Sequence, residues 1–197
     1  FRGFEAAWEI PGSEPTAING SWVKAPGAAL LEAIETELPF LSLVAEDLGI
    51  ITDEVEALRD QFNLPGMRIL QFAFDGNSGN PYLPSNYQTN CVVYTGTHDN
   101  DTTAGWFATL SDNEKQNIYD FLGWSSLPMP QALIHTALAS VANLAIIPMQ
   151  DILRLGSVDR MNTPGTVDGN WAWEFDWSQL QPEMAEFIAH RIRMFGR

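Results

Sequence analysis

Short apolar runs alternate with amphipathic stretches through most of the chain. The apolar runs are rich in β-favouring residues and predict buried strands. They lie at residues 41–45, 68–73, 91–95 and 144–148. The amphipathic stretches have the spacing of helices with one apolar face. They are residues 28–37, 52–62, 111–122, 131–143 and 182–195. This alternation predicts a parallel α/β fold.

Several local signals refine this pattern. Ser111 and Glu114 have the spacing of a capping box, and Gly123 is typical of a helix stop. Residues 1–26 and 155–170 lack periodicity and are predicted to be loops. Apolar aromatics alternate between Trp171 and Trp177, which predicts a further strand.

A polar or acidic residue follows each of the four predicted strands. These residues are Glu46, Asp75, Asp99 and Asp151. Acids at the same end of every parallel strand indicate an active face, as in a (β/α)8 barrel. A barrel needs eight strands and this chain supplies four, so the pattern is typical of part of one.

The stretch 91–106, CVVYTGTHDNDTTAGW, concentrates the candidate chemistry. An apolar strand is followed directly by His98 and Asp99, where ligands collect in α/β proteins. Two other interpretations stay open for these residues. Asp101 or Thr102 fits a helix cap, and the spacing Asp99-x-Asp101 fits oxygen ligands of a divalent metal.

Composition narrows the classes of protein. Ten basic residues against 25 acidic ones give a net charge of −15, which argues against nucleic-acid and anionic-membrane partners. No apolar run reaches the length of a membrane span. Cys91 is the only cysteine, so an intrachain disulfide is excluded and a buried, inert thiol is expected. The chain starts at Phe1 without a methionine, which we interpret as a fragment or a processed product.

Six motifs resemble one known family, glycoside hydrolase family 77, the 4-α-glucanotransferases or amylomaltases. They are VAEDLG (44–49), LPGMRILQFAF (64–74), NPYLPSNY (80–87), VYTGTHDNDTTAGW (93–106), PMQDIL (148–153) and RMNTPGT (160–166). FRGF, WEIP and WVKAPG near the start also resemble that family. Two residues depart from its pattern: Ser85 stands where histidine is expected, and Glu174 stands where arginine is expected.

The resemblance implies a fold and a domain organisation. It implies that residues 1–197 are the C-terminal part of one catalytic (β/α)8 barrel, with strands five to eight and a long active-site loop region at 1–27. The family's nucleophile is an aspartate just before the FRG sequence. We therefore expect it to lie outside this chain, on a missing N-terminal half, and we expect the isolated chain to be inactive. A cytoplasmic location is expected, or a plastid in a photosynthetic eukaryote.

The resemblance also implies roles for individual residues. Glu46 is similar to the general acid/base and Asp99 to the carboxylate that stabilises the transition state. Arg2 and His98 are similar to contacts of subsite −1, and weaker substrate contacts are implied for Phe72, Asp75 and Asn162. The implied reaction transfers α-1,4-glucan segments between malto-oligosaccharides with retention, and it needs no cofactor or metal.

Three rival functions remain open from the sequence. The first is a metal-dependent glycosyltransferase that uses Asp99-x-Asp101, although no glycine-rich or basic diphosphate site is visible. The second is a non-catalytic glucan-binding fragment, and the third is an α-amylase-type hydrolase. Trp8, Trp22 and Trp106 fit either sugar stacking or core packing. Trp171, Trp173 and Trp177 are interpreted as packing residues.

Overall fold

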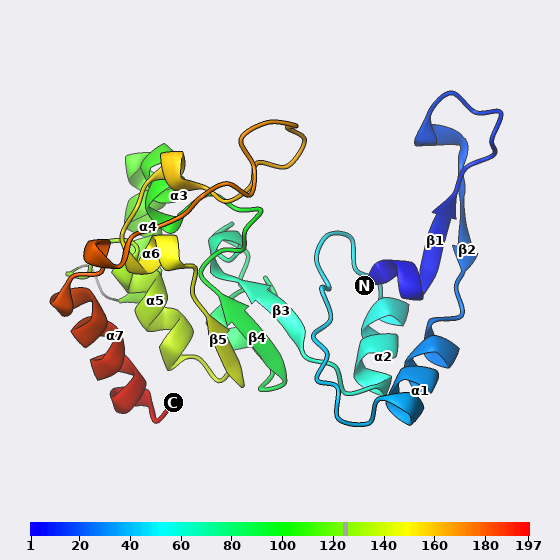
Figure 1. Ribbon diagram of the computed structural model, residues 1–197, viewed down its shortest axis with the longest axis horizontal. Helices are drawn as coiled ribbons and strands as arrows, with labels where there is room; N and C mark the ends of the chain where they lie inside the picture. Colours follow the sequence, from blue (N-terminus) through cyan, green and yellow to red (C-terminus); the bar gives the residue numbers. More distant parts are fainter. Residues whose placement is uncertain (124–125) are drawn as a thin grey trace. The chain divides into compact units, whose positions relative to one another are not determined.

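The computed structural model describes residues 1–123 and 126–197. It divides into two compact units, Phe1–Met67 and Arg68–Arg197. Figure 1 labels the elements of both units.

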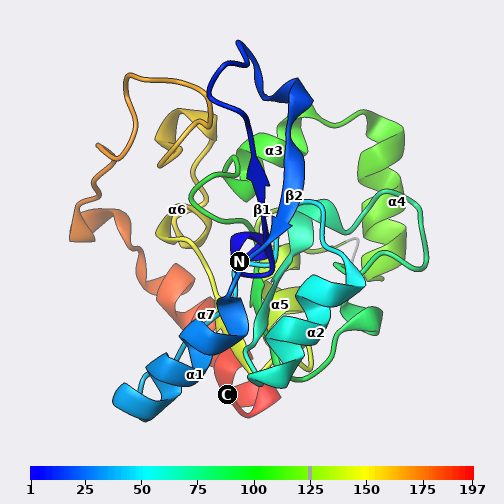
Figure 2. The same ribbon diagram turned by 90° about the vertical axis from the view of Figure 1, so that its right-hand side faces the viewer.

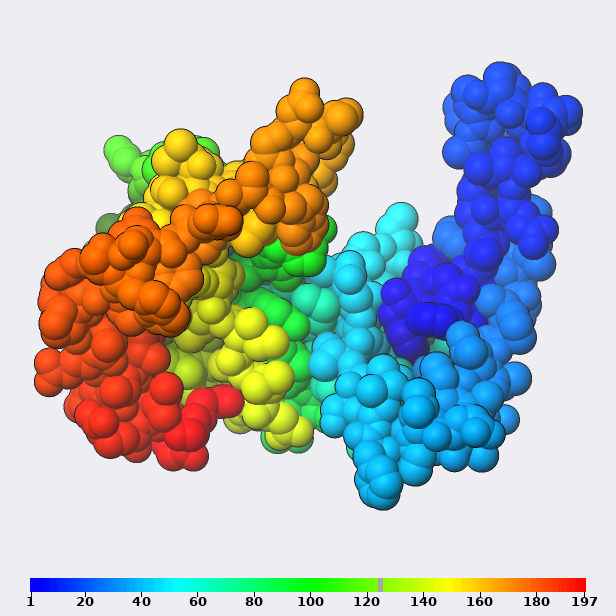
Figure 3. Space-filling view, in the orientation of Figure 1, coloured from blue at the N-terminus to red at the C-terminus, as the bar shows by residue number. Residues whose placement is uncertain are grey.

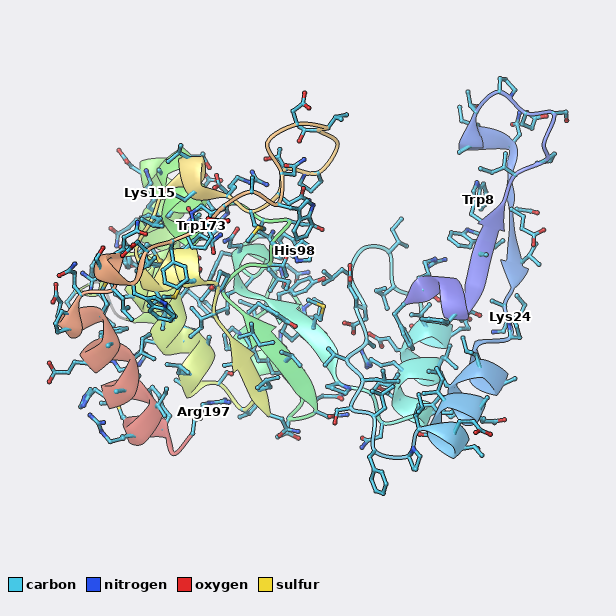
Figure 4. The ribbon with its side chains drawn as sticks, viewed as in Figure 1. Trp8, Lys24, His98, Lys115, Trp173 and Arg197 are labelled. Carbon is cyan, nitrogen blue, oxygen red and sulfur yellow. The ribbon has the colours of Figure 1, made fainter. Side chains whose placement is uncertain are left out.

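The first unit begins with an antiparallel hairpin rather than the expected loop. β1 (Ala6–Glu9) pairs with β2 (Ser21–Lys24), and Trp8 lies opposite Trp22. The two strands run side by side in Figures 1 and 2, and Figure 4 labels Trp8 within this hairpin. The indole rings meet edge to face at 5.3 Å, a cross-strand aromatic pair that stabilises the hairpin. The prediction of a loop was wrong because a long connection separates the two strands, so no local sequence signal indicates that they pair.

The two helices predicted at residues 28–37 and 52–62 are both present in the first unit. α1 spans Gly27–Glu37 and α2 spans Asp53–Gln61, with Val55 and Leu58 of α2 buried. The acidic residues of the first turn of α2 suit the positive end of the helix dipole.

The strand predicted at 41–45 does not form. Leu41 and Val44 are exposed, and the stretch has no strand partner among the described residues. A backbone hydrogen bond from Ala45 N to Pro65 O, at 2.9 Å, connects this stretch to the residues before β3 (Gly66–Ile69). A strand requires a neighbour to satisfy its backbone groups, so an apolar run alone was insufficient evidence.

Besides the β1-β2 pair, the described residues form a three-stranded sheet in the order β3-β4-β5. β3 is Gly66–Ile69, which crosses the boundary between the units, β4 is Cys91–Tyr94 and β5 is Leu144–Ile146. β4 and β5 are parallel, with Val93 opposite Ala145, which confirms the parallel arrangement for this pair. Each strand is shorter than its apolar run. β3 passes into a 3-10 turn at Leu70–Phe72, and β5 ends before Pro148, which has no backbone donor for a ladder.

The helices described in the second unit are α3 (Thr103–Thr109), α4 (Asp112–Leu122), α5 (Gln131–Ala139), α6 (Met149–Ile152) and α7 (Pro182–Phe195). Two of them, α4 and α5, pack against the apolar residues of β4. Cys91 and Val93 pack with Ile118 of α4 and Leu133 of α5 in the core, which confirms the buried thiol. The capping box of Ser111 and Glu114 is present at the start of α4, and Gly123 ends that helix in the left-handed conformation.

The last helix of the second unit packs against α5. α7 contacts α5, as Figure 1 shows. Beyond α7, the guanidinium of Arg197 donates to the carbonyls of Leu138, Ser140 and Ala142 at 2.7–2.8 Å. Figure 4 labels Arg197 at this end of the unit. These bonds satisfy carbonyls where α5 ends, four residues before the predicted end at Asn143.

The alternating aromatics at 171–177 do not form a strand. Trp173 and Phe175 stack on each other at 5.8 Å, and a 3-10 turn begins at Trp177. Trp171 and Trp177 are largely exposed, so neither is a core residue, although the Trp177 ring packs edge to face against Phe175 at 5.0 Å. In the described part of the chain, no helix is long and apolar enough to cross a bilayer.

Candidate active site

The loop between β4 and α3 contains the densest group of candidate residues. Its turn is closed by Asn100, whose side-chain oxygen accepts from the Thr97 amide and hydroxyl at 2.8 Å each. Thr102 caps α3 by accepting from Gly105 N at 3.1 Å. Thr102 is therefore the residue that caps α3. The carboxylate of Asp99 does not cap this helix and is available for another role.

Asp99 is bound by two residues that lie about sixty positions further along the chain. Its Oδ1 accepts from Asn162 Nδ2 at 2.6 Å, and its backbone carbonyl accepts from Arg160 at 3.0 Å. The Nε2 atom of His98 lies 3.4 Å from the same Oδ1. Asp99 and His98 are each about half exposed. The fold thus gathers His98, Asp99 and Asn162, three of the candidate residues, into one accessible polar cluster.

An exposed tryptophan borders this cluster. The Trp171 ring lies 5.0 Å from the His98 ring and is 63% exposed. Its backbone has φ of 62°, which is rare for a bulky residue, and its amide donates to Met161 O at 2.8 Å. Figure 4 labels His98 near the base of the loop that follows Asn162, and Figure 3 shows that loop projecting from the surface of the unit. Sequence reasoning missed Trp171, because only its contact with His98 relates it to the site.

Asp101 has partners different from those of Asp99. Its carboxylate accepts from the Ser157 hydroxyl at 2.7 Å and from the Thr102 amide at 2.8 Å. The structure therefore does not support the Asp99-x-Asp101 metal hypothesis. Within residues 1–123 and 126–197, no group of three or more His, Cys, Asp or Glu has the arrangement of a metal site.

Glu46 belongs to the first unit, where a buried neighbour fixes its backbone. Glu46 itself is exposed. The next residue, Asp47, is buried and accepts from Arg59 at 2.6 Å and from Met67 N at 2.6 Å. A Cβ on Gly66 would lie 2.3 Å from Asp47, so this position leaves no room for a side chain. Asp47 therefore anchors its own segment, which includes Glu46, to the start of β3.

The remaining candidates have simpler surroundings. Arg2, in the first unit, lies over the Trp22 ring at 4.0 Å and donates to Ile50 O. In the second unit, Phe72 is 44% exposed and packs edge to face against Tyr82 at 5.4 Å.

Asp75 lies in the exposed turn that follows β3. A hydrogen bond from the Asn77 amide, at 2.9 Å, is the main cause that lowers the pKa of Asp75. Its carboxylate therefore stays ionised at neutral pH and can accept hydrogen bonds.

Residues 1–179 match the family model described as 4-alpha-glucanotransferase. The chain belongs to this 4-α-glucanotransferase family. The resemblance found in the motifs is thereby confirmed across most of the chain.

Individual 4-α-glucanotransferases agree with the family model. The chain is 51% identical over 200 residues to the enzyme of a Synechocystis species and 53% identical over 191 residues to that of Thermus thermophilus. These matches cover 100% and 93% of this chain but only 40% and 38% of the relatives. The chain therefore spans about two-fifths of their length.

A solved structure shows the same fold. Amylomaltase from Streptococcus agalactiae, in complex with acarbose, superimposes with a TM-score of 0.92 at 36% identity. That superposition covers 100% of this chain and 40% of the amylomaltase. The chain therefore has an α/β fold that resembles amylomaltase.

Proposed function

We propose that this chain supplies the acid/base and the stabilising carboxylate of an enzyme that transfers α-1,4-glucan segments between malto-oligosaccharides. The observation that carries the proposal is the contact of His98, Asp99 and Asn162 in a chain of the 4-α-glucanotransferase family. The Streptococcus agalactiae amylomaltase was solved with acarbose, which supports a carbohydrate ligand for this chain as well.

Glu46 is proposed as the general acid/base. A retaining transfer needs a nucleophilic carboxylate and an acid about 5–5.5 Å apart, on either side of the scissile bond. Glu46 protonates the leaving oxygen, and the ionised side chain then deprotonates the incoming sugar 4-hydroxyl. Its exposure leaves it accessible to substrate, while the Asp47 anchor limits the movement of its backbone.

Asp99 is proposed as the carboxylate that opposes the positive charge of the oxocarbenium-like transition state. Its hydrogen bond from Asn162 holds Oδ1, which fixes the orientation of the carboxylate before substrate binds. His98 and Asn162 are proposed to contact sugar hydroxyls beside it. Arg2, Phe72 and Asp75 remain proposed substrate contacts. Trp171 offers an exposed aromatic face beside His98.

The nucleophile and the rest of the barrel are proposed to come from outside residues 1–197. The family pattern that suggests this is an aspartate immediately before the FRG sequence. The coverage of about two-fifths of the relatives is consistent with a longer whole protein. In this proposal β3, β4 and β5 belong to strands five to eight of a (β/α)8 barrel.

One assay separates this function from its rivals. The complete enzyme, incubated with maltotriose, should release glucose and form longer oligosaccharides, and EDTA should not change the rate because the mechanism uses carboxylates alone. Loss of activity in EDTA, restored by a divalent ion, would favour the metal-dependent glycosyltransferase. Glucose and maltose without longer products would favour a hydrolase, and binding without turnover would favour a non-catalytic glucan-binding protein.

A further inference from the structure

Asp151 is a buried carboxylate with an unusual set of partners. It lies in α6, just after β5, and is 1% exposed. Its Oδ1 accepts from the Thr103 amide at 2.7 Å, and its Oδ2 accepts from the Thr103 hydroxyl at 2.7 Å. The Thr95 hydroxyl also donates to Oδ2. Three donors therefore converge on two oxygens.

These partners lie at the two ends of the loop that carries Asp99. Thr95 directly follows β4, and Thr103 is the first residue of α3. A single carboxylate thus fastens the start and the end of residues 96–102. Because Asp151 belongs to the segment after β5, it ties this loop to the neighbouring strand of the sheet.

Gln71 supports the same loop from the segment after β3. Its amide donates to the Asp101 carbonyl at 2.9 Å. A Cβ on Gly96 would lie 2.5 Å from this amide, so a side chain at position 96 would displace the Gln71 side chain from its present place. The backbone on which Asp99 stands is therefore held from both neighbouring strands.

The chemistry of the network favours an ionised acceptor. A carboxylate accepts at both oxygens, whereas an amide would present an NH2 group to one of the three donors. Burial raises the pKa of Asp151, and the hydrogen bonds from Thr95 and Thr103 oppose that rise. Removal of any donor leaves a buried charge less well satisfied, which is costly in a dry interior.

We propose that Asp151 is a positioning residue that fixes the loop 96–102 and so orients Asp99 and His98 for glucan transfer. This inference rests on the proposed function of Asp99. Asp151 is too buried to touch substrate, so it acts through the loop. Substitution of Asp151 should lower kcat more than it changes KM. A small displacement of Asp99, which stabilises the transition state, slows the reaction without weakening ground-state binding of the substrate.

The test uses four variants of the complete enzyme. Asp151→Asn and Thr103→Val should lower kcat about 10–100-fold, as loss of an orienting partner typically does, with KM changed less than about threefold. Thr103→Ser keeps both the amide and the hydroxyl donor, so it should retain most of the wild-type kcat. Thr136→Val is the matched control: Thr136 is also buried, but its hydroxyl donates to Ala132 O within α5, so its loss should spare kcat.

A second readout is independent of activity. Hydrogen exchange, measured by mass spectrometry on the peptide that spans residues 95–106, should quicken in Asp151→Asn and Thr103→Val and stay unchanged in Thr136→Val. Unchanged exchange and kcat within twofold of wild type in both loop variants would overturn the role of Asp151. Absence of glucan transfer by the wild-type enzyme would instead refute the proposed function, and the exchange data would still decide whether Asp151 holds the loop.

Discussion

Replacing Glu46 with glutamine in the complete enzyme is expected to slow transfer from maltotriose by about 10²–10⁴-fold, the usual contribution of a general acid/base. Glutamine has nearly the same shape but cannot donate a proton to the leaving sugar. The exposed position of Glu46 and the separate anchoring of Asp47 mean that the fold should tolerate this change. Initial rates of glucose release measure the effect.

The choice of donor makes this prediction specific to acid catalysis. α-Glucosyl fluoride has a good leaving group and needs little protonation, so Glu46→Gln should still form the glycosyl-enzyme from it at a rate close to wild type. Glu56→Gln, at an exposed position on α2, is the matched control and should leave both rates unchanged. Equal slowing with both donors would show that Glu46 is not the acid.

Replacing Asp99 with asparagine is expected to lower kcat by about 10²-fold or more, on the scale of losing one preorganised electrostatic group. The amide oxygen of asparagine can still accept from Asn162, so the cluster keeps its shape and loses only the charge. Because that charge matters most when the oxocarbenium ion forms, KM should change less than kcat.

Steady-state kinetics with maltotriose separate these two constants. Asp168→Asn removes a carboxylate from an exposed position on the loop that follows Asn162 and should leave both constants unchanged. A kcat for Asp99→Asn equal to that of wild type would assign Asp99 a purely structural role in the loop.

Local signals in the sequence predicted the elements whose stability is local. α4 carries its own capping box and glycine stop, and α7 begins at Pro182 and ends at Phe195 as its periodicity indicates. The run at 41–45 failed because apolar residues indicate burial, whereas a strand also needs a partner. The hairpin of β1 and β2 was missed for the converse reason, since its pairing joins segments separated by a long connection.

In the candidate site too, the sequence identified individual residues but not the contacts between distant segments. Motifs identified His98, Asp99 and Asn162, but only the fold shows that Asn162 binds Asp99 directly. Asp151 follows β5 as the pattern predicted, but it is 1% exposed and bonds to Thr95 and Thr103, a buried position that the pattern did not indicate. The roles of Trp171 and Asp151 depend on contacts between distant segments, which no local pattern records.

The most direct test of the whole account is glucose release from maltotriose by residues 1–197 alone, by the remainder of the enzyme alone, and by the two combined. We predict no release by residues 1–197, because Glu46 and Asp99 lack a nucleophile there, and measurable release when the remainder is added. Turnover by residues 1–197, purified free of the remainder, would contradict both the assigned roles and the proposal that the active site is completed from outside this chain.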